Sequence, residues 1–467
     1  MSQEASQQPA DSGMTAGERR SSLSLAFIFA LRMMGLFMIY PVFAVFARQL
    51  PDATPALIGL ALGIYGLTQA MLQIPFGMMS DRIGRKPVIA GGLLLFSLGS
   101  VVAALSSSIY GIILGRMLQG AGAVGSTILA LGADLTREEQ RTKAMAVIGM
   151  TIGLSFALAV VLGPLLNSWI GVPGIFWLTA IFGLLGIAVL IWATPRPSQT
   201  RLHRDTEAVP ALFRRVLTDG QLLRLDFGIF ALHAVLTATF VALPVALHSV
   251  AKFSLHQQWM LYLPVLVISV IGMVPLIIIA EKYRRMKPVY LGAILAIAAA
   301  QFSLGAWHGS LWAVIPTLII FFTAFNLMEA SLPSLISKAA PPTSKGTAMG
   351  VYSSSQFLGI FIGGTLGGWI QGHYGLAAVF ALAGCIALIW FGIAITMPQP
   401  SYLSSYLLRV GRLRSGEADR LAEQLLAVHG VADAVVVGEE GVAYLKVDSK
   451  ELDESALHRF SDAGAQL

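Results

Sequence analysis

Charged residues are scarce in this chain: only 12% of its 467 residues are Asp, Glu, Lys or Arg, whereas soluble domains carry roughly 25%. Apolar residues make up 56%, and the mean hydropathy is +0.73. A soluble protein of this composition would lack the polar side chains that it needs to cover its surface. The composition therefore excludes an ordinary soluble fold and indicates a protein that crosses the membrane several times.

Cysteine is nearly absent. The single residue, Cys385, lies in an apolar run, so an internal disulfide and a cluster of thiolate metal ligands are both excluded. The sequence also lacks a glycine-rich phosphate loop of the kind that binds ATP, and it offers no convincing pair of nucleophile and base. We therefore expect no enzymatic activity, no cofactor and no metal site.

Long apolar runs are abundant. A membrane-spanning helix needs about 20 mostly apolar residues, and the sequence contains a dozen such stretches. They are 22–47, 55–79, 87–107, 109–134, 142–168, 173–194, 223–250, 257–281, 288–308, 311–336, 344–372 and 376–397. The sequence therefore predicts an all-α membrane protein with twelve transmembrane helices.

Basic residues are distributed unevenly along these runs. If the N-terminus is cytoplasmic, the cytoplasmic connections and tails hold all of the 31 Lys and Arg residues except Arg32, Arg48, Arg116 and Lys252. Because cytoplasmic loops of membrane proteins carry an excess of Lys and Arg, we expect both termini to be cytoplasmic. The net charge of +6 then reflects basic groups that face the lipid bilayer, and no nucleic acid partner is expected.

The chain repeats itself at a nearly constant offset. Lys86-Pro87-Val88 recurs as Lys287-Pro288-Val289, and Ala144-Met145 recurs as Ala348-Met349. This predicts two pseudo-symmetric six-helix bundles, an arrangement in which transporters place their substrate near the membrane midplane. The predicted divisions are a disordered cytoplasmic tail at 1–21, an N-terminal bundle at 22–194, a cytoplasmic linker at 195–222, a C-terminal bundle at 223–397 and a cytoplasmic domain at 401–467.

The last segment differs in character from the rest, because it is rich in charges. Alternating and helical patterns predict strands at 402–410, 431–437 and 442–447 and helices at 417–428 and 455–460. The order βαββα predicts a small α+β domain of the ferredoxin-like type.

One charge cluster interrupts the apolar runs near the second predicted helix. Residues 77–86 read Gly-x-x-x-Asp-Arg-x-Gly-Arg-Lys and lie between two membrane-length segments. Buried charges need partners, so this segment is expected to be a loop at the bilayer surface. Its pattern resembles the loop between helices 2 and 3 of the major facilitator superfamily of secondary transporters.

The resemblance extends over residues 22–397 and implies the twelve-helix fold of that superfamily. Segments 325–330, 332–338 and 345–359, together with the small C-terminal domain, resemble a group of bacterial inner-membrane transporters within it. This group implies proton-driven efflux and an appended cytoplasmic domain. That domain resembles heavy-metal-associated domains in fold, but it lacks their Cys-x-x-Cys metal ligands.

The resemblance assigns the charged loop the role of a conformational latch. The latch residues are Gly77, Asp81, Arg82, Gly84, Arg85 and Lys86, with Asp134, Gly346 and Gly350 as partners. Asp81 is expected at the N-terminal end of the eleventh helix, where the helix dipole favours a carboxylate, and the basic residues are expected near Asp134, Glu138 or Glu139. The alternative is that these basic residues only fix the topology.

Ionisable residues inside spans are functional candidates by default. Glu329 is the first candidate for a proton carrier, because burial of a carboxyl favours its neutral form, and His233 is the second. Arg116 matches the superfamily's Arg-x-x-Gln-Gly motif, which is linked to proton coupling, and Arg32 lies near the middle of the first helix. The alternative for each is a structural ion pair or hydrogen bond.

Polar groups that could face a central cavity are Tyr40, Tyr65, Gln69, Asn326 and Tyr352. The aromatic and apolar character of the helices favours a small lipophilic or amphipathic substrate. Glycines in the fifth helix (Gly149, Gly153 and Gly163, followed by Pro164) partly match an antiporter motif, whereas a Gly-x-x-x-Gly face in the eleventh helix fits close packing.

The sequence thus favours a proton-coupled secondary transporter, an efflux antiporter that works as a monomer in the inner membrane by alternating access. Its partners are a small-molecule substrate, protons and the lipid bilayer. The alternative is a membrane sensor that signals through its C-terminal domain.

Overall fold

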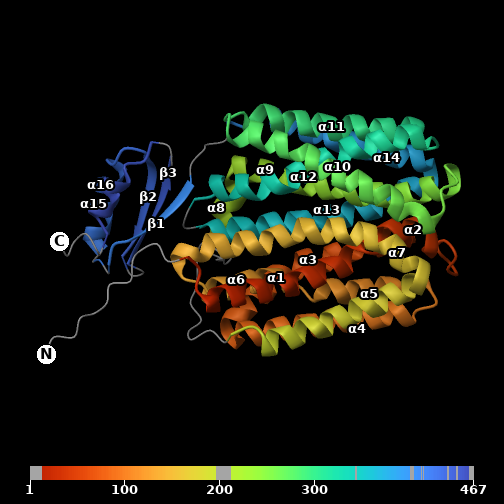
Figure 1. The fold of residues 1–467 in the computed structure, drawn as a ribbon, viewed down its shortest axis with the longest axis horizontal. Coiled ribbons are helices and arrows are strands. Elements are labelled where there is room, and N and C mark those ends of the chain that lie inside the picture. The colour runs from red at the N-terminus through yellow and green to blue at the C-terminus, as the bar shows by residue number, and fades with distance from the viewer. Residues whose placement is uncertain are drawn as a thin grey trace.

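The computed structural model describes residues 13–195, 212–341, 344–399, 404–411, 413, 415–438, 441–448 and 451–461. Two layers of long helices pack side by side, and a small domain lies at one end of them (Figure 1). The helices of the first layer are α1 (Ala16–Phe37), α2 (Tyr40–Ala47), α3 (Pro55–Ile83), α4 (Arg85–Leu105), α5 (Ile109–Ala121), α6 (Gly125–Asp134) and α7 (Glu138–Trp192). Those of the second are α9 (Gly220–Val245), α10 (Gln258–Glu281), α11 (Met286–Trp307), α12 (Leu311–Ala339), α13 (Lys345–Tyr374) and α14 (Leu376–Ile395), and the short α8 (Phe213–Thr218) precedes them.

Ten helical segments of the described chain are long and apolar enough to cross a membrane. One of them, Lys143–Trp192, has 50 residues and is broken at Gly171, whose φ of 67° lies outside the helical region, so it makes two crossings. The 30-residue α13 adds another crossing; it falls outside the ten because glycine and polar residues lower its hydropathy. The twelve-helix fold predicted from the sequence is therefore confirmed.

The ends of the first bundle differ from the prediction. α1 begins at Ala16, because Thr15 and Glu18 form a capping box in which each side chain accepts a hydrogen bond from the other residue's backbone N–H. The expected disordered tail to residue 21 is therefore wrong for residues 16–21. Residues 1–12, and residues 196–211 of the expected linker, lie outside the described residues.

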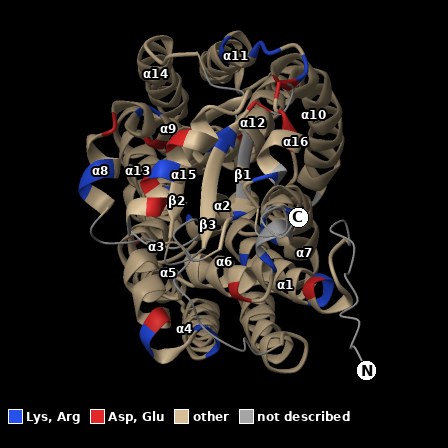
Figure 2. Cartoon of the chain, turned by 90° about the vertical axis from the view of Figure 1, so that its left-hand side faces the viewer, with Lys and Arg blue, Asp and Glu red and all other residues tan. Residues whose placement is uncertain are grey.

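Many Lys, Arg, Asp and Glu positions lie at the end of the bundle next to the small domain, which faces the viewer in Figure 2. We call this the basic end. It carries the loops that begin after Asp134 and Glu281, whereas the helix centres are almost free of charge. The separation agrees with the uneven distribution of Lys and Arg along the sequence.

The C-terminal domain consists of β1 (Ser404–Arg409), α15 (Ser415–Leu426), β2 (Val431–Val437), β3 (Val442–Val447) and α16 (Glu454–His458). The strand order is β1-β3-β2, with β3 antiparallel to both neighbours. The parallel strands β1 and β2 thus flank β3, as in the split βαβ unit of ferredoxin-like folds. The predicted small α+β domain is confirmed, and its buried core includes Leu425, Leu445 and Leu457.

The two bundles meet most closely where α13 crosses α3. A Cβ atom added at Gly59 of α3 would overlap the carbonyl oxygen of Gly364, and one added at Gly368 would come within 2.8 Å of the Gly59 Cα. The opposite face of α13 is also made of glycine, because Gly359 and Gly363 lie against the backbone of α9. Small residues permit such close helix packing in membranes, so α13 is in backbone contact with both bundles.

We predict that Gly59→Ala destabilises the protein, because the added methyl group has no room at this crossing. Overpacking of a tight site costs about 1–3 kcal/mol. Gly91→Ala is the matched control, since a Cβ atom at Gly91 meets nothing within 4 Å. The melting temperature of the purified protein in detergent should fall for Gly59→Ala and stay at the wild-type value for Gly91→Ala. Equal melting temperatures for the two variants would contradict this account.

Candidate functional site

The charged loop between α3 and α4 is built around one left-handed glycine. Gly84 has φ of 97°, a conformation that L side chains rarely adopt, and it lets α4 start one residue after α3 ends. The tight turn places the Arg85 side chain between two carboxylates. Arg85 forms an ion pair with Asp81, and its Nε donates to Asp134 Oδ2 at 3.2 Å. Arg85 also donates to Ser80 Oγ at 2.8 Å.

The predicted latch residues meet across the boundary between the bundles. A narrow pocket at the basic end is lined by Gly77, Asp81 and Arg85 from the first bundle and by Gly346 and Gly350 of α13. The structure therefore brings Asp81 close to the start of α13, as the sequence suggested. The Arg85 and Asp134 side chains are almost fully buried, whereas 31% of the Asp81 side chain is exposed.

Two of the predicted latch residues lie elsewhere. Arg82 is exposed and forms no ion pair with the described residues, so its place in the latch stays a prediction. It follows Asp81 on α3 and therefore points to a different face of that helix. Lys86 donates to the carbonyl oxygens of Leu190, at 3.0 Å, and Thr194. The side chains of Glu138 and Glu139 lie outside the described part of the structure.

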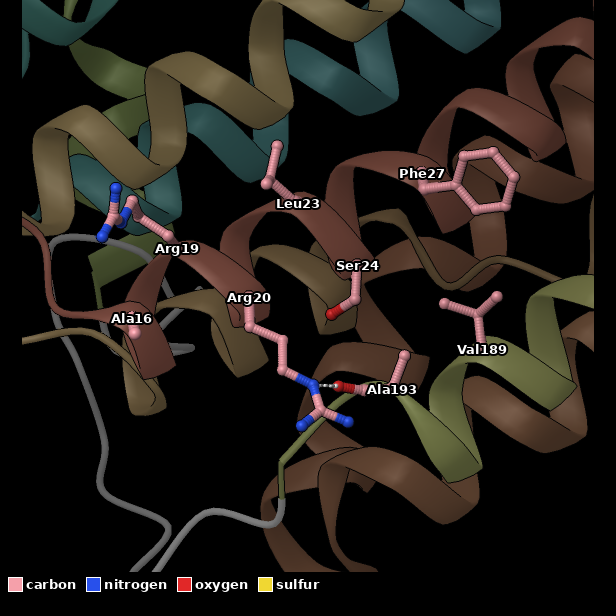
Figure 3. Close-up of a pocket in the computed structure, with 8 residues that line it drawn as sticks. All are labelled: Ala16, Arg19, Arg20, Leu23, Ser24, Phe27, Val189 and Ala193. Carbon is pink, nitrogen blue, oxygen red and sulfur yellow. Dashed lines mark hydrogen bonds between the residues drawn. The ribbon is translucent and has the colours of Figure 1, made fainter.

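Lys86 and Arg20 both donate hydrogen bonds to backbone carbonyl groups at the C-terminal end of α7. Figure 3 shows a shallow groove between α1 and the end of α7, in which Arg20 Nε donates to Ala193 O at 2.9 Å. Helix C-termini leave carbonyl groups without helical partners and attract cations. Lys86 and Arg20 thus hold the end of α7 against α4 and α1.

Arg32 lies at the centre of the first bundle and is 1% exposed. Its Nη2 donates to Tyr65 Oη at 2.7 Å and to Gln69 Oε1, and Gln69 Nε2 donates to Gln73 Oε1 at 2.9 Å. Three predicted site residues, Arg32, Tyr65 and Gln69, therefore form one hydrogen-bonded line. The line runs along α3 toward Gln73, which also lines the pocket at the basic end.

Arg116 also lies beside Tyr65. Its Nη1 donates to Gln119 Oε1 at 2.7 Å, Gln119 Nε2 donates to Ser100 Oγ at 2.7 Å, and its Nε donates to Ala61 O at 3.3 Å. The Tyr65 ring centroid lies 5.0 Å from the Arg116 Cζ and 5.9 Å from the Arg32 Cζ. The two guanidinium groups therefore share one aromatic ring.

In the second bundle the structure brings together the two proton-carrier candidates. His233 Nε2 of α9 lies 3.7 Å from Glu329 Oε2 of α12. His233 Nδ1 lies 3.3 Å from Ile229 O, and its Nε2 lies 2.9 Å from Gln356 Nε2 of α13. The amide of Gln356 can donate and the carbonyl of Ile229 can only accept, which assigns the neutral tautomer with the proton on Nδ1.

Aromatic side chains fill the space between the bundles. Ring pairs cross the boundary at Tyr40–Phe240 (5.7 Å between centroids), Tyr65–Phe357 (6.2 Å) and Phe156–Phe325 (5.5 Å). We call these three pairs the aromatic seam. Two more predicted cavity residues lie on the helices of this region: the buried Tyr352, on α13, has a hydroxyl without a hydrogen-bond partner among the described residues, and Asn326, on α12, is half-buried.

Sequence reasoning missed two residues of this site. Gln356 was part of a recognised segment, but only the structure shows that it faces His233. Asp226 of α9 is 4% exposed, and neither of its carboxylate oxygens has a hydrogen-bond partner among the described residues. The sequence did not indicate this burial, because Asp226 lies near the end of a predicted span, where a side chain normally contacts water.

Polar contacts attach the C-terminal domain to the second bundle. Lys446 of β3 donates to Lys338 O at 2.6 Å, which caps the C-terminal end of α12, and Asp448 forms an ion pair with Arg284 at 2.9 Å. Burial at this contact lowers the pKa of Lys446. The helix that is capped in this way also carries Glu329.

Comparison with known proteins identifies the family. The sequence profile described as Major Facilitator Superfamily matches residues 25–364 and 257–408. The chain belongs to this superfamily. A second profile, the YajR YAM domain, matches residues 414–459. The superfamily consists of transporters, so the chain is a membrane transporter that crosses the bilayer several times.

Relatives within the superfamily cover most of the chain. The inner membrane transport protein YajR of Escherichia coli is 48% identical over 94% of this chain and 96% of its own length. An uncharacterized transporter of Buchnera aphidicola is 34% identical over 74% of this chain and 89% of its own. The multidrug resistance protein MdtH of Proteus mirabilis is 26% identical over 73% and 84%, respectively.

Solved structures show the same fold. A bacterial homologue of the human lysosomal transporter Spinster, in an inward-facing and occupied conformation, superposes with a TM-score of 0.69 at 15% identity and covers 82% of this chain and 97% of its own. The human organic anion transporter MFSD10 superposes with a TM-score of 0.60 at 19% identity and covers 81% and 100%. Identities this low show the fold alone.

The burial of the loop charges predicts an order of stabilities. Asp134→Asn should destabilise the protein strongly, because breaking a buried ion pair costs about 3–5 kcal/mol, and the remaining Asp81 pair favours the lower end of this range. Asp81→Asn should cost about 1 kcal/mol or less, since its side chain is partly exposed. Melting temperatures in detergent measure the order, and an equal or larger loss for Asp81→Asn would contradict it.

Proposed function

We propose that this chain is a proton-coupled secondary transporter, an antiporter that exports a small lipophilic or amphipathic molecule. The observation that carries the proposal is the group formed by His233, Glu329 and Gln356 on three helices of the second bundle, beside the aromatic seam. Ionisable groups inside a membrane mark ion and substrate pathways. The relative MdtH is named for multidrug resistance, which supports export of a lipophilic substrate.

Glu329 is the proposed proton carrier. Its Oε2 is buried and has no hydrogen-bond partner among the described residues, although His233 Nε2 lies 3.7 Å away. A carboxyl in such a place is neutral when protonated and needs a counter-charge when it releases its proton. His233 can accept a proton at Nε2 and supply that charge, once Gln356 moves away from it. We assign the supporting roles in coupling to Arg116 and Arg32.

The loop between α3 and α4 is the proposed latch. Gly77, Asp81 and Arg85 face Gly346 and Gly350 across the pocket between the basic ends of α3 and α13, and the turn at Gly84 positions them. A wider separation of Asp81 from Gly346 and Gly350 would open this pocket. Lys86 anchors the loop to the end of α7. Alternating access then consists of closing and opening this end of the boundary between the bundles.

We further propose that the basic end faces the cytoplasm, with both termini on that side, and that the protein resides in the inner membrane, as the name of its relative YajR states for that protein. Exposed apolar side chains such as Ile271 and Trp312 support contact with the lipid bilayer. One chain supplies both bundles, which supports a monomer as the working unit.

The contact of Lys446 with the end of α12 is the one observation that favours the alternative, a sensor that signals through its C-terminal domain. Removal of residues 401–467 separates the two functions. A transporter keeps part of its flux after this deletion, whereas a sensor loses its function.

Glu329→Gln should abolish proton-coupled flux, because the amide cannot carry a proton. The matched control is Glu281→Gln: Glu281 lies at the end of α10 and pairs with Lys338 at 3.3 Å, with 44% of its side chain exposed. Proteoliposomes with an imposed pH gradient and a chemically diverse substrate panel measure the flux. Wild-type coupling in Glu329→Gln would remove this residue from the mechanism.

Asp81→Asn tests the latch. We expect the transport rate to fall several-fold while the affinity for substrate stays the same, because Asp81 lies at the basic end, away from the aromatic seam. Arg82→Gln is the control from the same loop, since Arg82 makes no ion pair with the described residues. Transport at the wild-type rate in Asp81→Asn would reduce the loop to a determinant of topology.

A further inference from the structure

Two buried guanidinium groups in the first bundle have no carboxylate partner in the part of the chain that the structure describes. Arg32 and Arg116 are 1% and 0% exposed, and every hydrogen bond that they make goes to a neutral group. Other arginines of the same bundle differ in this respect. Arg85 pairs with Asp81 and Asp134, and Arg137 pairs with Glu18 at 2.9 Å.

The missing counter-charge matters because of where the two groups lie. An unpaired charge in a low-dielectric interior costs several kcal/mol, and proteins normally pair such groups. Both arginines also keep unused donors: Arg32 Nε, Arg32 Nη1 and Arg116 Nη2 have no hydrogen-bond partner among the described residues. Three nitrogen donors and two positive charges therefore point to an anion that these residues bind.

The surroundings restrict what such an anion can be. Both guanidinium groups lie near the Tyr65 ring, at 5.9 Å and 5.0 Å from its centroid, and the same ring contacts Phe357 within the aromatic seam. A ligand here would meet cations at one end and aromatic faces along its body. This combination fits one planar anionic group on an aromatic or alkyl skeleton and does not fit a sugar.

A route to this place starts at the basic end. The pocket between α3, α6 and α13 is lined by Asp81 at its outer part and by Gln73, which lies about two helical turns further along α3. Gln73 is hydrogen-bonded to Gln69, which accepts a hydrogen bond from Arg32. A polar line thus connects the pocket to the first guanidinium group.

We propose that Arg32 and Arg116 bind the anionic group of the substrate, and that the substrate is an amphipathic monoanion of the carboxylate type. The proposal rests on the transport function proposed above and names the class of its substrate. Arginine suits this task because its planar guanidinium donates two parallel hydrogen bonds to a carboxylate, whereas lysine presents a point charge.

The test measures binding to the full-length protein in lipid nanodiscs by isothermal titration with three probes of one shape: 2-naphthoate, its neutral carboxamide and the cationic naphthylmethylammonium. The dissociation constant of 2-naphthoate should be at least tenfold lower than those of the other two. Arg32→Gln should raise it at least tenfold, and Arg32→Lys should raise it less and keep the preference for the carboxylate.

Arg19→Gln is the control variant, because Arg19 lies on the same helix but is exposed at the basic end. It should leave all three dissociation constants unchanged. The wild-type ranking of the three probes stands as a test even if Arg32→Gln fails to fold. Equal or tighter binding of the carboxamide or the ammonium probe, no binding of 2-naphthoate by the folded wild type, or no effect of Arg32→Gln relative to Arg19→Gln would overturn the proposal.

The two proposals fail in different ways. If 2-naphthoate binds with the expected ranking but no flux follows the pH gradient, the anion site stands and proton coupling is refuted. If Glu329→Gln abolishes proton-coupled flux but the probes bind without regard to charge, the transport mechanism stands and the anion site is refuted.

Discussion

The exclusion of water from the centre of a bilayer is the constraint on which this structure depends. Every backbone group must find its hydrogen bond within a helix, and every charge must find a partner or a use. The fold satisfies the backbone groups by crossing the membrane with twelve helices. Most charged residues that form ion pairs lie at the basic end, where Asp81, Arg85 and Asp134 meet at the tight turn of Gly84. The charges that remain inside, among them Arg32, Arg116 and Glu329, are consequently the positions where function is to be sought.

The same constraint explains why so much of the fold follows from the sequence. The length of an apolar run is set by the thickness of the membrane, so runs such as 55–79 and 311–336 predict helices without any knowledge of packing. Two of the three strands of the C-terminal domain, at 431–437 and 442–447, are equally plain, because a segment with glycine at both ends separates two short runs rich in valine. The exact ends of the helices are more difficult to predict. The helix α1 starts earlier than its apolar run, because a capping box of polar residues begins it.

Parts of the candidate site could not be predicted, since they depend on the rotation of each helix about its axis. Arg82 and Arg85 are both basic residues of one loop, yet one is exposed and the other lies between two carboxylates. The meeting of His233 with Gln356 joins residues that are far apart in the chain. Such facts are decided by which faces pack together, and in membrane helices of nearly uniform hydropathy the pattern of apolar residues does not mark those faces.

The glycine faces of α13 have a mechanical consequence. Where these glycines lie, no side chain separates α13 from α3 or α9, and the three helices touch through their backbones. Side chains between two helices can absorb a small displacement by rotating, whereas helices in direct backbone contact have to move together. We therefore expect a tilt of α3, which leads into the charged loop, to displace α13 and α9 as well. The hydrogen bond between Gln356 of α13 and His233 of α9 lies between the same two helices, so we expect such a displacement to change the surroundings of the buried imidazole.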